Sequence, residues 1–365
     1  MRRSAGRARP ASSIPSSRDA GIAVIRATGR PRSVIVMDCP AATSATTADA
    51  FCFRARIPTV EMFYTVAHWT VDPDEGLPAL LPDAAPEGSP VAVKIVSWNM
   101  NHSLEPWQEL PGMDADIALL QEACRPPAEV ARRIEVDAEP WRTPGRDFMM
   151  LWRAAVVGLS DRVELEWIEA ESLERAAPWE LAVSCPGTLA AASVTVPGVE
   201  RFVVVSMWSV RTQPHPSTCS SWMVSDASAH RLLSDLSALI GQERGHRIVV
   251  AGDLSVLRGY GESGSDYWAA RYETVFSRME ALGLPFVGPQ EPNGRQADPW
   301  PDELPEGSRN VPTYHPPMRG PVTATRQLDY VFASRDMADS VQVRAINEPE
   351  DWGPSDHCRL EIEVS

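Results

Sequence analysis

The sequence predicts an α/β protein in which β-sheets pack face to face and helices cover their outer faces. Short apolar runs with turn residues between them follow one another from Val91 to the C-terminus. Several of these runs are continuously apolar, which is typical of strands that are covered on both faces. Only a few stretches have the periodicity of an amphipathic helix. Many strands and few helices therefore indicate stacked sheets with helices outside.

The strands are expected at the apolar runs of this region, in chain order. These runs are 91–100, 116–123, 148–154, 188–196, 201–210, 247–255, 328–334, 341–346 and 358–364. Residues 163–170 (VELEWIEA) alternate between polar and apolar positions, so this run predicts an edge strand.

Helices are expected where apolar residues recur every three or four positions, at 126–135, 224–243 and 265–283. The second stretch has one apolar stripe, made of Leu232, Leu233, Leu236, Leu239 and Ile240. The third has another, made of Tyr272, Val275, Phe276, Met279 and Leu282. Gly283 then predicts the C-terminal cap of the third helix.

Residues 1–90 differ from the rest of the chain. Their first part is rich in Arg, Ser and Ala and nearly free of acids, a composition that buries too little apolar surface to order itself. A transit peptide has a similar composition, and translation could also begin at Met37 or Met62; we favour disorder or a later start. Residues 73–90 are rich in Pro, Gly and acids, as linkers are. We therefore expect a disordered or poorly ordered tail and linker over 1–90 and one folded domain over 91–365.

Charge is distributed unevenly along the chain. Residues 1–33 carry eight Arg and one acid, a charge of +7; because the total is −15, the remaining residues carry −22. Such an acidic body argues against broad, charge-driven binding to nucleic acid, which needs Lys and Arg to displace counterions. A site whose divalent cation supplies the positive charge stays compatible with this composition.

No apolar run is long enough to predict a membrane-spanning helix. The six cysteines form no CxxC pair and no zinc-finger spacing. We interpret them as reduced, small apolar side chains, and we expect a cytoplasmic protein.

Polar residues stand at or near the ends of several predicted strands. They are Asn99, Glu122, Asp253, Asp329, Asp356 and His357. Side chains at strand ends can converge at one edge of a sheet, and buried carboxylates are costly unless they are paired or bind a metal. This pattern predicts a divalent cation with oxygen ligands.

Such a cluster suits the hydrolysis of a phosphoester. A hard cation such as Mg²⁺ neutralises charge on the phosphoryl oxygens. A further carboxylate can deprotonate water, and a protonated His can pair with a phosphoryl oxygen. An Asp bonded to that His would orient it and keep it charged.

The segments SWN (97–99), QE (121–122), GDLS (252–255), LDYVF (328–332) and SDH (355–357) occur in the order found in the endonuclease/exonuclease/phosphatase family. Residues 91–365 thus resemble that family, which includes pancreatic-type deoxyribonucleases, abasic-site endonucleases, sphingomyelinases and inositol-polyphosphate phosphatases. The resemblance implies a deoxyribonuclease I-like fold: a four-layer sandwich of two mostly antiparallel β-sheets flanked by helices. It also implies a Mg²⁺- or Mn²⁺-dependent phosphoester hydrolase, of the phosphodiesterase or nuclease type.

The resemblance further implies a role for each motif residue. Glu122 is then the principal metal ligand, and Asn99 binds metal or phosphate beside it. Asp253 positions and activates the attacking water. Asp329 orients His357, which contacts the phosphate. Asp356 lies on the metal or just behind it.

Two positions depart from the family pattern. Ser255 stands where the family usually has an Asn that holds phosphate or nucleophile, and its hydroxyl is a shorter arm with one donor. Trp208 stands where a His usually follows the middle strand, and an indole cannot shuttle a proton. We place both in the substrate-binding part of the site. His215 or His230 could supply the missing imidazole, although a loop and a structural role, respectively, are the simpler interpretations.

Other residues stay open between two interpretations. His102, directly after the first motif, could contact the rim of the site or face solvent. Tyr314, in the loop before LDYVF, could line the cleft or anchor the loop. The long Pro-rich segment 286–327 has arginines that could reach a substrate or pair with nearby acids; they are Arg295, Arg309, Arg319 and Arg326.

The substrate class stays open as well: DNA or RNA, a nucleotide, a phospholipid head group or a sugar phosphate. A nuclease is first by resemblance. The alternative is a catalytically weak or inactive binding protein on the same fold, because of Trp208 and Ser255. The sequence leaves the oligomeric state open.

Overall fold

The computed structural model describes residues 92–144, 149–210, 222–240 and 246–365, and the backbone of four short segments before them. The chain divides into two compact units, Met1–Ala85 and Pro86–Ser365. In the first unit, two antiparallel pairs are described: β1 (Ala20–Ile25) with β2 (Ile35–Pro40), and β3 (Cys52–Ile57) with β4 (Val60–Thr65). The remainder of the predicted tail, 1–90, lies outside the described residues.

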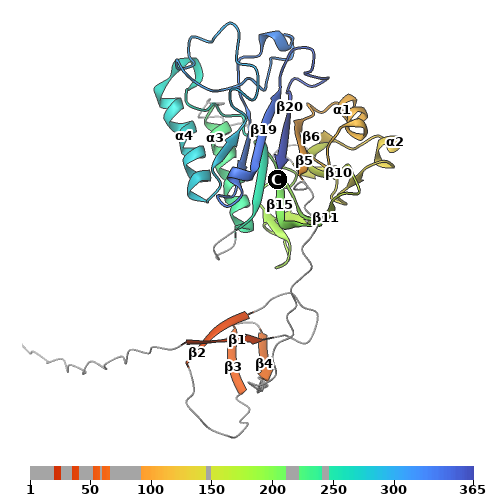
Figure 1. Cartoon of the computed structure of the whole chain (residues 1–365), viewed down its shortest axis with the longest axis vertical. Helices are drawn as coiled ribbons and strands as arrows, with labels where there is room; N and C mark the ends of the chain where they lie inside the picture. The colour runs from red at the N-terminus through yellow and green to blue at the C-terminus, as the bar shows by residue number, and fades with distance from the viewer. Residues whose placement is uncertain are drawn as a thin grey trace, which may run out of the picture. The chain divides into compact units, whose positions relative to one another are not determined.

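The first six-stranded sheet of the second unit brings together both ends of that unit (Figure 1). Its strands, in order across the sheet, are β19 (Val341–Ile346), β20 (Arg359–Val364), β5 (Val93–Asn99), β6 (Ile117–Cys124), β10 (Trp152–Gly158) and β7 (Glu135–Val136). The pair β5–β6 is parallel and its other pairs are antiparallel. The last strand of the chain, β20, thus pairs with β5, which is the first strand of this sheet in chain order.

The second six-stranded sheet is built from the middle of the chain. Its strands, in order, are β11 (Glu164–Ile168), β14 (Leu189–Val196), β15 (Val199–Trp208), β16 (Ile248–Asp253), β18 (Asp329–Ala333) and β17 (Phe286–Gly288). Only β15–β16 is parallel among its pairs. The alternating run that predicts an edge strand is β11, at the edge of this sheet, as expected. Two short pairs complete the strands: β12 (Ala170–Ser172) with β13 (Leu181–Val183), and β8 (Thr143–Pro144) with β9 (Met149–Met150).

Helices cover the outer faces of the two sheets (Figure 1). The helices α3 (Trp222–Leu236) and α4 (Asp266–Ala281) pack on the second sheet, and the short α1 (Glu105–Glu109) and α2 (Ala128–Ala131) pack on the first. The predicted four-layer α/β sandwich is confirmed, with one parallel pair in each otherwise antiparallel sheet. None of the helices in the described segments has the length and apolar character needed to cross a membrane.

Strand alternation explains why so many runs are continuously apolar. In β5, Val93 and Ile95 join the core between the two sheets, whereas Val96 and Trp98 join the core under α1. In β16 the same division places Val249 between the sheets and the neighbouring Val250 under the helices. Both faces of these strands are covered, so both sets of positions are apolar.

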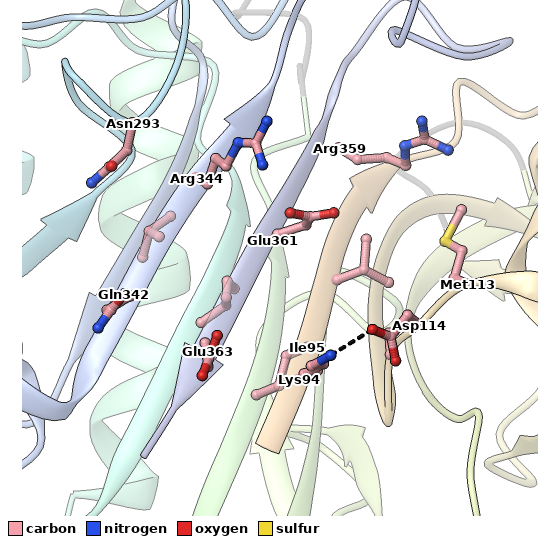
Figure 2. Close-up of a pocket in the computed structure, with 14 residues that line it drawn as sticks. Lys94, Ile95, Met113, Asp114, Asn293, Gln342, Arg344, Arg359, Glu361 and Glu363 are labelled. Atoms are coloured by element: carbon pink, nitrogen blue, oxygen red, sulfur yellow. Dashed lines mark hydrogen bonds and ion pairs between the residues drawn. The ribbon is translucent and has the colours of Figure 1, made fainter. Parts of the chain in front are cut away.

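The outer face of β19 and β20 is an exception, because none of the helices in the described residues covers it (Figure 1). Gln342, Arg344, Glu361 and Glu363 are exposed there and line a shallow cavity of about 540 Å³ (Figure 2). Polar side chains at every second position are what one solvated face of a sheet requires.

Two predicted elements differ in extent from the structure. The helix expected at 126–135 is only the single turn of α2, because Glu135 and Val136 pair with β10 instead of continuing the helix. The strand expected at 148–154 is divided: Met149–Met150 belong to β9, and β10 runs on to Gly158. Gly283 follows α4 with a φ of +79°, as expected of a cap.

Candidate active site

Asn99 stands at the end, and Glu122 near the end, of the two parallel strands of the first sheet. Asn99 is the last residue of β5 and is only 1% exposed. Its side-chain Nδ2 donates to Glu122 Oε1 at 3.3 Å and to Asp253 Oδ2 at 3.2 Å. Because Asp253 belongs to the second sheet, the amide of Asn99 links the two sheets at the site.

Asp253 is the last residue of β16 and lies in the centre of a row of three residues. In the strand register, Asp253 is opposite Trp208 of β15 on one side and opposite Asp329 of β18 on the other. Adjacent strands lie about 5 Å apart, so these three residues are immediate neighbours across the sheet.

His357 is held against this row. Its Nδ1 lies 2.8 Å from Asp329 Oδ2, and its Nε2 lies 4.0 Å from Asp253 Oδ2. The backbone around it is fixed by Ser355, whose Oγ accepts from the N–H of His357 and donates to the carbonyl of Asn99. Ser355, the first residue of SDH, therefore ties the last motif to the first.

These residues meet at one pocket of about 290 Å³. Its lining includes six of the predicted residues, which are Glu122, Trp208, Asp253, Ser255, Asp356 and His357. The other two, Asn99 and Asp329, lie behind the lining and reach it through their hydrogen bonds. The structure thus brings together all eight residues singled out from the motifs.

Burial and charge set the protonation of the inner residues. Burial, reinforced by the neighbouring carboxylates, raises the pKa of Asp253 to about 7 despite the opposing charge of His357. Burial alone would lower the pKa of His357, but the charge and hydrogen bond of Asp329, together with Asp253 and Asp356, raise it to about 10. His357 is therefore charged at neutral pH, and Asp253 can take up or release a proton there.

The outer carboxylates have oxygens suited to a cation. Burial would raise the pKa of Glu122, but the hydrogen bond and charge of His102, together with His357 and Asn99, outweigh it and lower this pKa. Asp356 lines the pocket, burial raises its pKa, and its buried Oδ1 has no hydrogen-bond partner. An unpartnered buried carboxylate oxygen is costly, and a bound cation would satisfy it.

No three acidic, His or Cys side chains in the described part of the chain form a ready-made metal cage. Mg²⁺ does not require one, since it is usually held by one or two carboxylates together with waters and substrate phosphates. Glu122 and Asp356 therefore fit such an ion.

The backbone around the pocket adopts left-handed conformations that are uncommon outside glycine. The φ angles of Asn101, His102, Glu122 and Ser255 are between +46° and +57°. Each such residue costs free energy, and strain of this kind gathers at functional sites. Four of them at one pocket indicate that its geometry is kept at the expense of local stability.

The two departures from the family pattern lie on either side of Asp253. Ser255 donates to Asp253 Oδ1 from its N–H at 2.6 Å and from its Oγ at 3.1 Å, so its hydroxyl is hydrogen-bonded to the carboxylate. Trp208 is 6% exposed and forms part of the wall. His230 lies on α3, outside the pocket lining, with Nε2 2.9 Å from Thr274 Oγ1. His215 lies outside the described residues.

Four further residues contribute to the pocket or its support. His102 and Tyr314, for which the sequence leaves two interpretations, both line the pocket, and the ring of Tyr314 lies 5.0 Å from that of His357. Trp152 lines it from β10, with no motif to indicate this. Beneath the site, Gln121 donates from Nε2 to Ser206 Oγ of the second sheet. The QE motif is the sequence signal for Gln121.

Of the loop arginines considered from sequence, three lie within 4 Å of carboxylates. Their partners are Glu348 for Arg295, Glu291 for Arg309 and Glu262 for Arg326. No Lys or Arg is found among the described residues that line the pocket. His357, whose pKa is raised to about 10, is a source of positive charge in this lining.

Comparison with known families identifies the class of protein. The model of the Endonuclease/Exonuclease/phosphatase family matches residues 96–357, and the chain belongs to this family. Comparison with curated proteins gives no significant match.

Several solved structures are similar to this chain. The endonuclease domain of TRAS1, a telomere-specific non-LTR retrotransposon, is 17% identical, with a TM-score of 0.47, over 75% of this chain and 98% of that one. The AP endonuclease LMAP from Leishmania major is 15% identical, with a TM-score of 0.48, over 75% and 87%. The 3′-5′ exonuclease NExo from Neisseria meningitidis is 18% identical, with a TM-score of 0.43, over 75% and 100%.

Proposed function

We propose that the chain is a divalent-metal-dependent hydrolase of phosphoester bonds, of the phosphodiesterase or nuclease type. The observation that carries the proposal is the buried set of Asp253, His357 and Asp329. A carboxyl group with a pKa of about 7 lies 4.0 Å from an imidazole that a second carboxylate keeps charged. One group can thus accept a proton while the other offers positive charge to a phosphoryl oxygen.

The proposed reaction uses these residues in one displacement. Ionised Asp253 orients a water molecule and takes its proton as the water oxygen attacks phosphorus. The bond from phosphorus to the leaving oxygen breaks, and that oxygen takes a proton from solvent. His357 donates from Nε2 to a phosphoryl oxygen, and Asp329 fixes the ring through Nδ1.

Glu122 and Asp356 would hold Mg²⁺ or Mn²⁺ beside these groups. When bound, the ion would neutralise charge on the phosphoryl oxygens. Asn99 turns its Nδ2 toward Glu122 and Asp253, while its Oδ1 accepts from the N–H of Asn101. Both N–H donors of the amide are used by these two carboxylates, so the arrangement suits a residue that positions them.

The substrate is expected to present a single phosphoester to the pocket. The described lining has aromatic and apolar side chains and no Lys or Arg, so recognition of a chain of phosphates has little support there. Trp208 then contributes contact area for the substrate, and Ser255 contributes through its hydrogen bonds to Asp253. DNA, RNA, nucleotides, phospholipid head groups and sugar phosphates are the classes to compare.

One observation favours a second candidate function, a weakly active or inactive binding protein. Trp208 removes an imidazole that the family usually has next to Asp253, and His230 does not replace it. The loss of one acid–base group typically costs about 10²- to 10⁴-fold in rate.

Hydrolysis of bis(p-nitrophenyl) phosphate with Mg²⁺ or Mn²⁺ tests the proposal, alongside plasmid DNA and a panel of the other phosphoesters. We expect metal-dependent turnover that falls at least about 100-fold in Glu122→Ala and His357→Ala. His230→Ala is the matched control and should keep full activity. Activity that survives both site substitutions would rule out the proposed site, and a folded protein inactive on the whole panel would favour the binding protein.

A further inference from the structure

We propose that His102 is a positioning residue that fixes the carboxylate of Glu122 for metal binding. This inference rests on the proposed function, in which Glu122 is the principal metal ligand. Its basis is a direct contact: His102 Nε2 lies 2.6 Å from Glu122 Oε2, a short, charge-assisted hydrogen bond. The imidazole is 40% exposed and lines the pocket beside the carboxylate.

The position of His102 is determined by several contacts with the strands beside it. Its N–H donates to the carbonyl of Glu122 at 3.2 Å, so main chain and side chain both dock on one residue. Its carbonyl accepts from Cys124 Sγ at 3.1 Å. Its ring lies on Trp152, with ring centres 3.9 Å apart. With a φ of +57°, His102 adopts a conformation that costs free energy, and these contacts hold it there.

The consequence for Glu122 is that each carboxylate oxygen has its own donor. Oε2 accepts from His102 and Oε1 accepts from Asn99, so the carboxylate is held from both sides. Each carboxylate oxygen has more than one acceptor site, so an oxygen that accepts a hydrogen bond can still face a cation. A ligand oriented before the ion arrives loses less freedom on binding, which raises affinity.

Partners behind a metal ligand typically change metal affinity about 10- to 100-fold when they are removed. We therefore expect His102→Ala to raise the dissociation constant for Mg²⁺ by about that factor. At saturating Mg²⁺, kcat should stay close to that of the parent chain, since His102 acts only through Glu122. His102→Gln keeps a side-chain N–H donor and should recover most of the affinity.

Isothermal titration calorimetry of the full chain with MgCl₂ and MnCl₂ measures this directly, and His230→Ala is the control that should bind like the parent chain. Circular dichroism establishes that each variant is folded. Pulsed electron paramagnetic resonance of the Mn²⁺-loaded chain adds a second readout, the coupling of the ion to ¹⁴N. We expect no ¹⁴N coupling that depends on His102.

Two results would overturn the proposal while the proposed function stands. One is unchanged Mg²⁺ affinity in His102→Ala. The other is a ¹⁴N coupling that disappears in His102→Gln, which would make His102 a direct ligand. A parent chain that binds neither ion would instead overturn the metal-dependent function, and this inference with it.

Discussion

Asp329→Asn isolates the charge that Asp329 places on His357. The pair is buried, with 2% of Asp329 and 5% of His357 exposed, and 2.8 Å separates Oδ2 from Nδ1. Asparagine keeps an oxygen that can accept from Nδ1–H, so the ring keeps its orientation while the negative charge is lost. The substitution therefore tests whether a charged imidazole is what the reaction needs.

The size of the effect follows from the protonation of His357. With a pKa of about 10, the imidazole is charged in almost every molecule at pH 7.5. Asp329 is the largest contribution that raises this pKa, and burial opposes it. If the pKa returns only to its ordinary value of 6.5, about one molecule in ten is charged at pH 7.5. We expect kcat to fall about 10- to 100-fold, the larger value including weaker stabilisation of the phosphoryl oxygens.

The assay is hydrolysis of bis(p-nitrophenyl) phosphate at saturating Mg²⁺ between pH 6 and pH 8.5. The result is expressed as the ratio of parent to variant kcat at each pH. This ratio should be small near pH 6 and grow with pH, because only the variant loses its imidazole charge in that range. Asp339→Asn, at an exposed position, is the control. A ratio that stays the same across this range would refute the reasoning.

Three further predictions concern stability, the wall of the pocket and polymeric substrates. Burial raises the pKa of Glu139 from 4.5 to about 7, so this residue stabilises the fold fully below pH 4.5 and loses that contribution as pH rises through 7. The free energy of unfolding of Glu139→Gln, measured in urea, should therefore exceed that of the parent chain by about 2 kcal/mol at pH 8 and equal it at pH 4. The same difference at both pH values would contradict this. Trp208→His returns the imidazole that the family usually has and should raise kcat about 10-fold or more. The loss of the indole should lower the free energy of unfolding by about 2 kcal/mol. An unchanged kcat in the folded variant would show that the indole does not limit the reaction. Activity on an oligonucleotide should depend weakly on salt, with a slope of log KM against log salt below about 2, and a slope near 6 would reveal phosphate contacts beyond the described pocket.

The parts of the fold that the sequence predicts are those with a repeated local pattern. The long strands β15 and β16 are apolar on both faces, and α4 has a complete apolar stripe and a glycine cap. The very short strands β7, β12 and β17 have two or three residues and no period to recognise. The pairing of β20 with β5 is fixed by packing between segments far apart in sequence, which no local pattern contains.

The residues of the candidate site also divide into those that the sequence predicts and those that it does not. The motif residues could be predicted because each stands at or near a strand end, where residue type and position are both visible in the sequence. The contact of His102 with Glu122 could not, because it depends on left-handed backbone at both residues and on Trp152 from another strand. The role of Ser255 also depends on its turn, which directs the hydroxyl to Asp253.

The two departures from the family pattern both lie next to Asp253, and Ser255 contacts it directly. Ser255 holds Oδ1 and Asn99 holds Oδ2, so the carboxylate is fixed at both oxygens. Trp208, its neighbour in register, is buried and offers no charge. Burial makes the Asp253 carboxyl ionise less readily, and its raised pKa of about 7 makes it a stronger base than an exposed aspartate. Trp at this position thus removes one acid–base group that the family usually has, but a carboxyl group with a pKa of about 7 can still serve as the base at neutral pH.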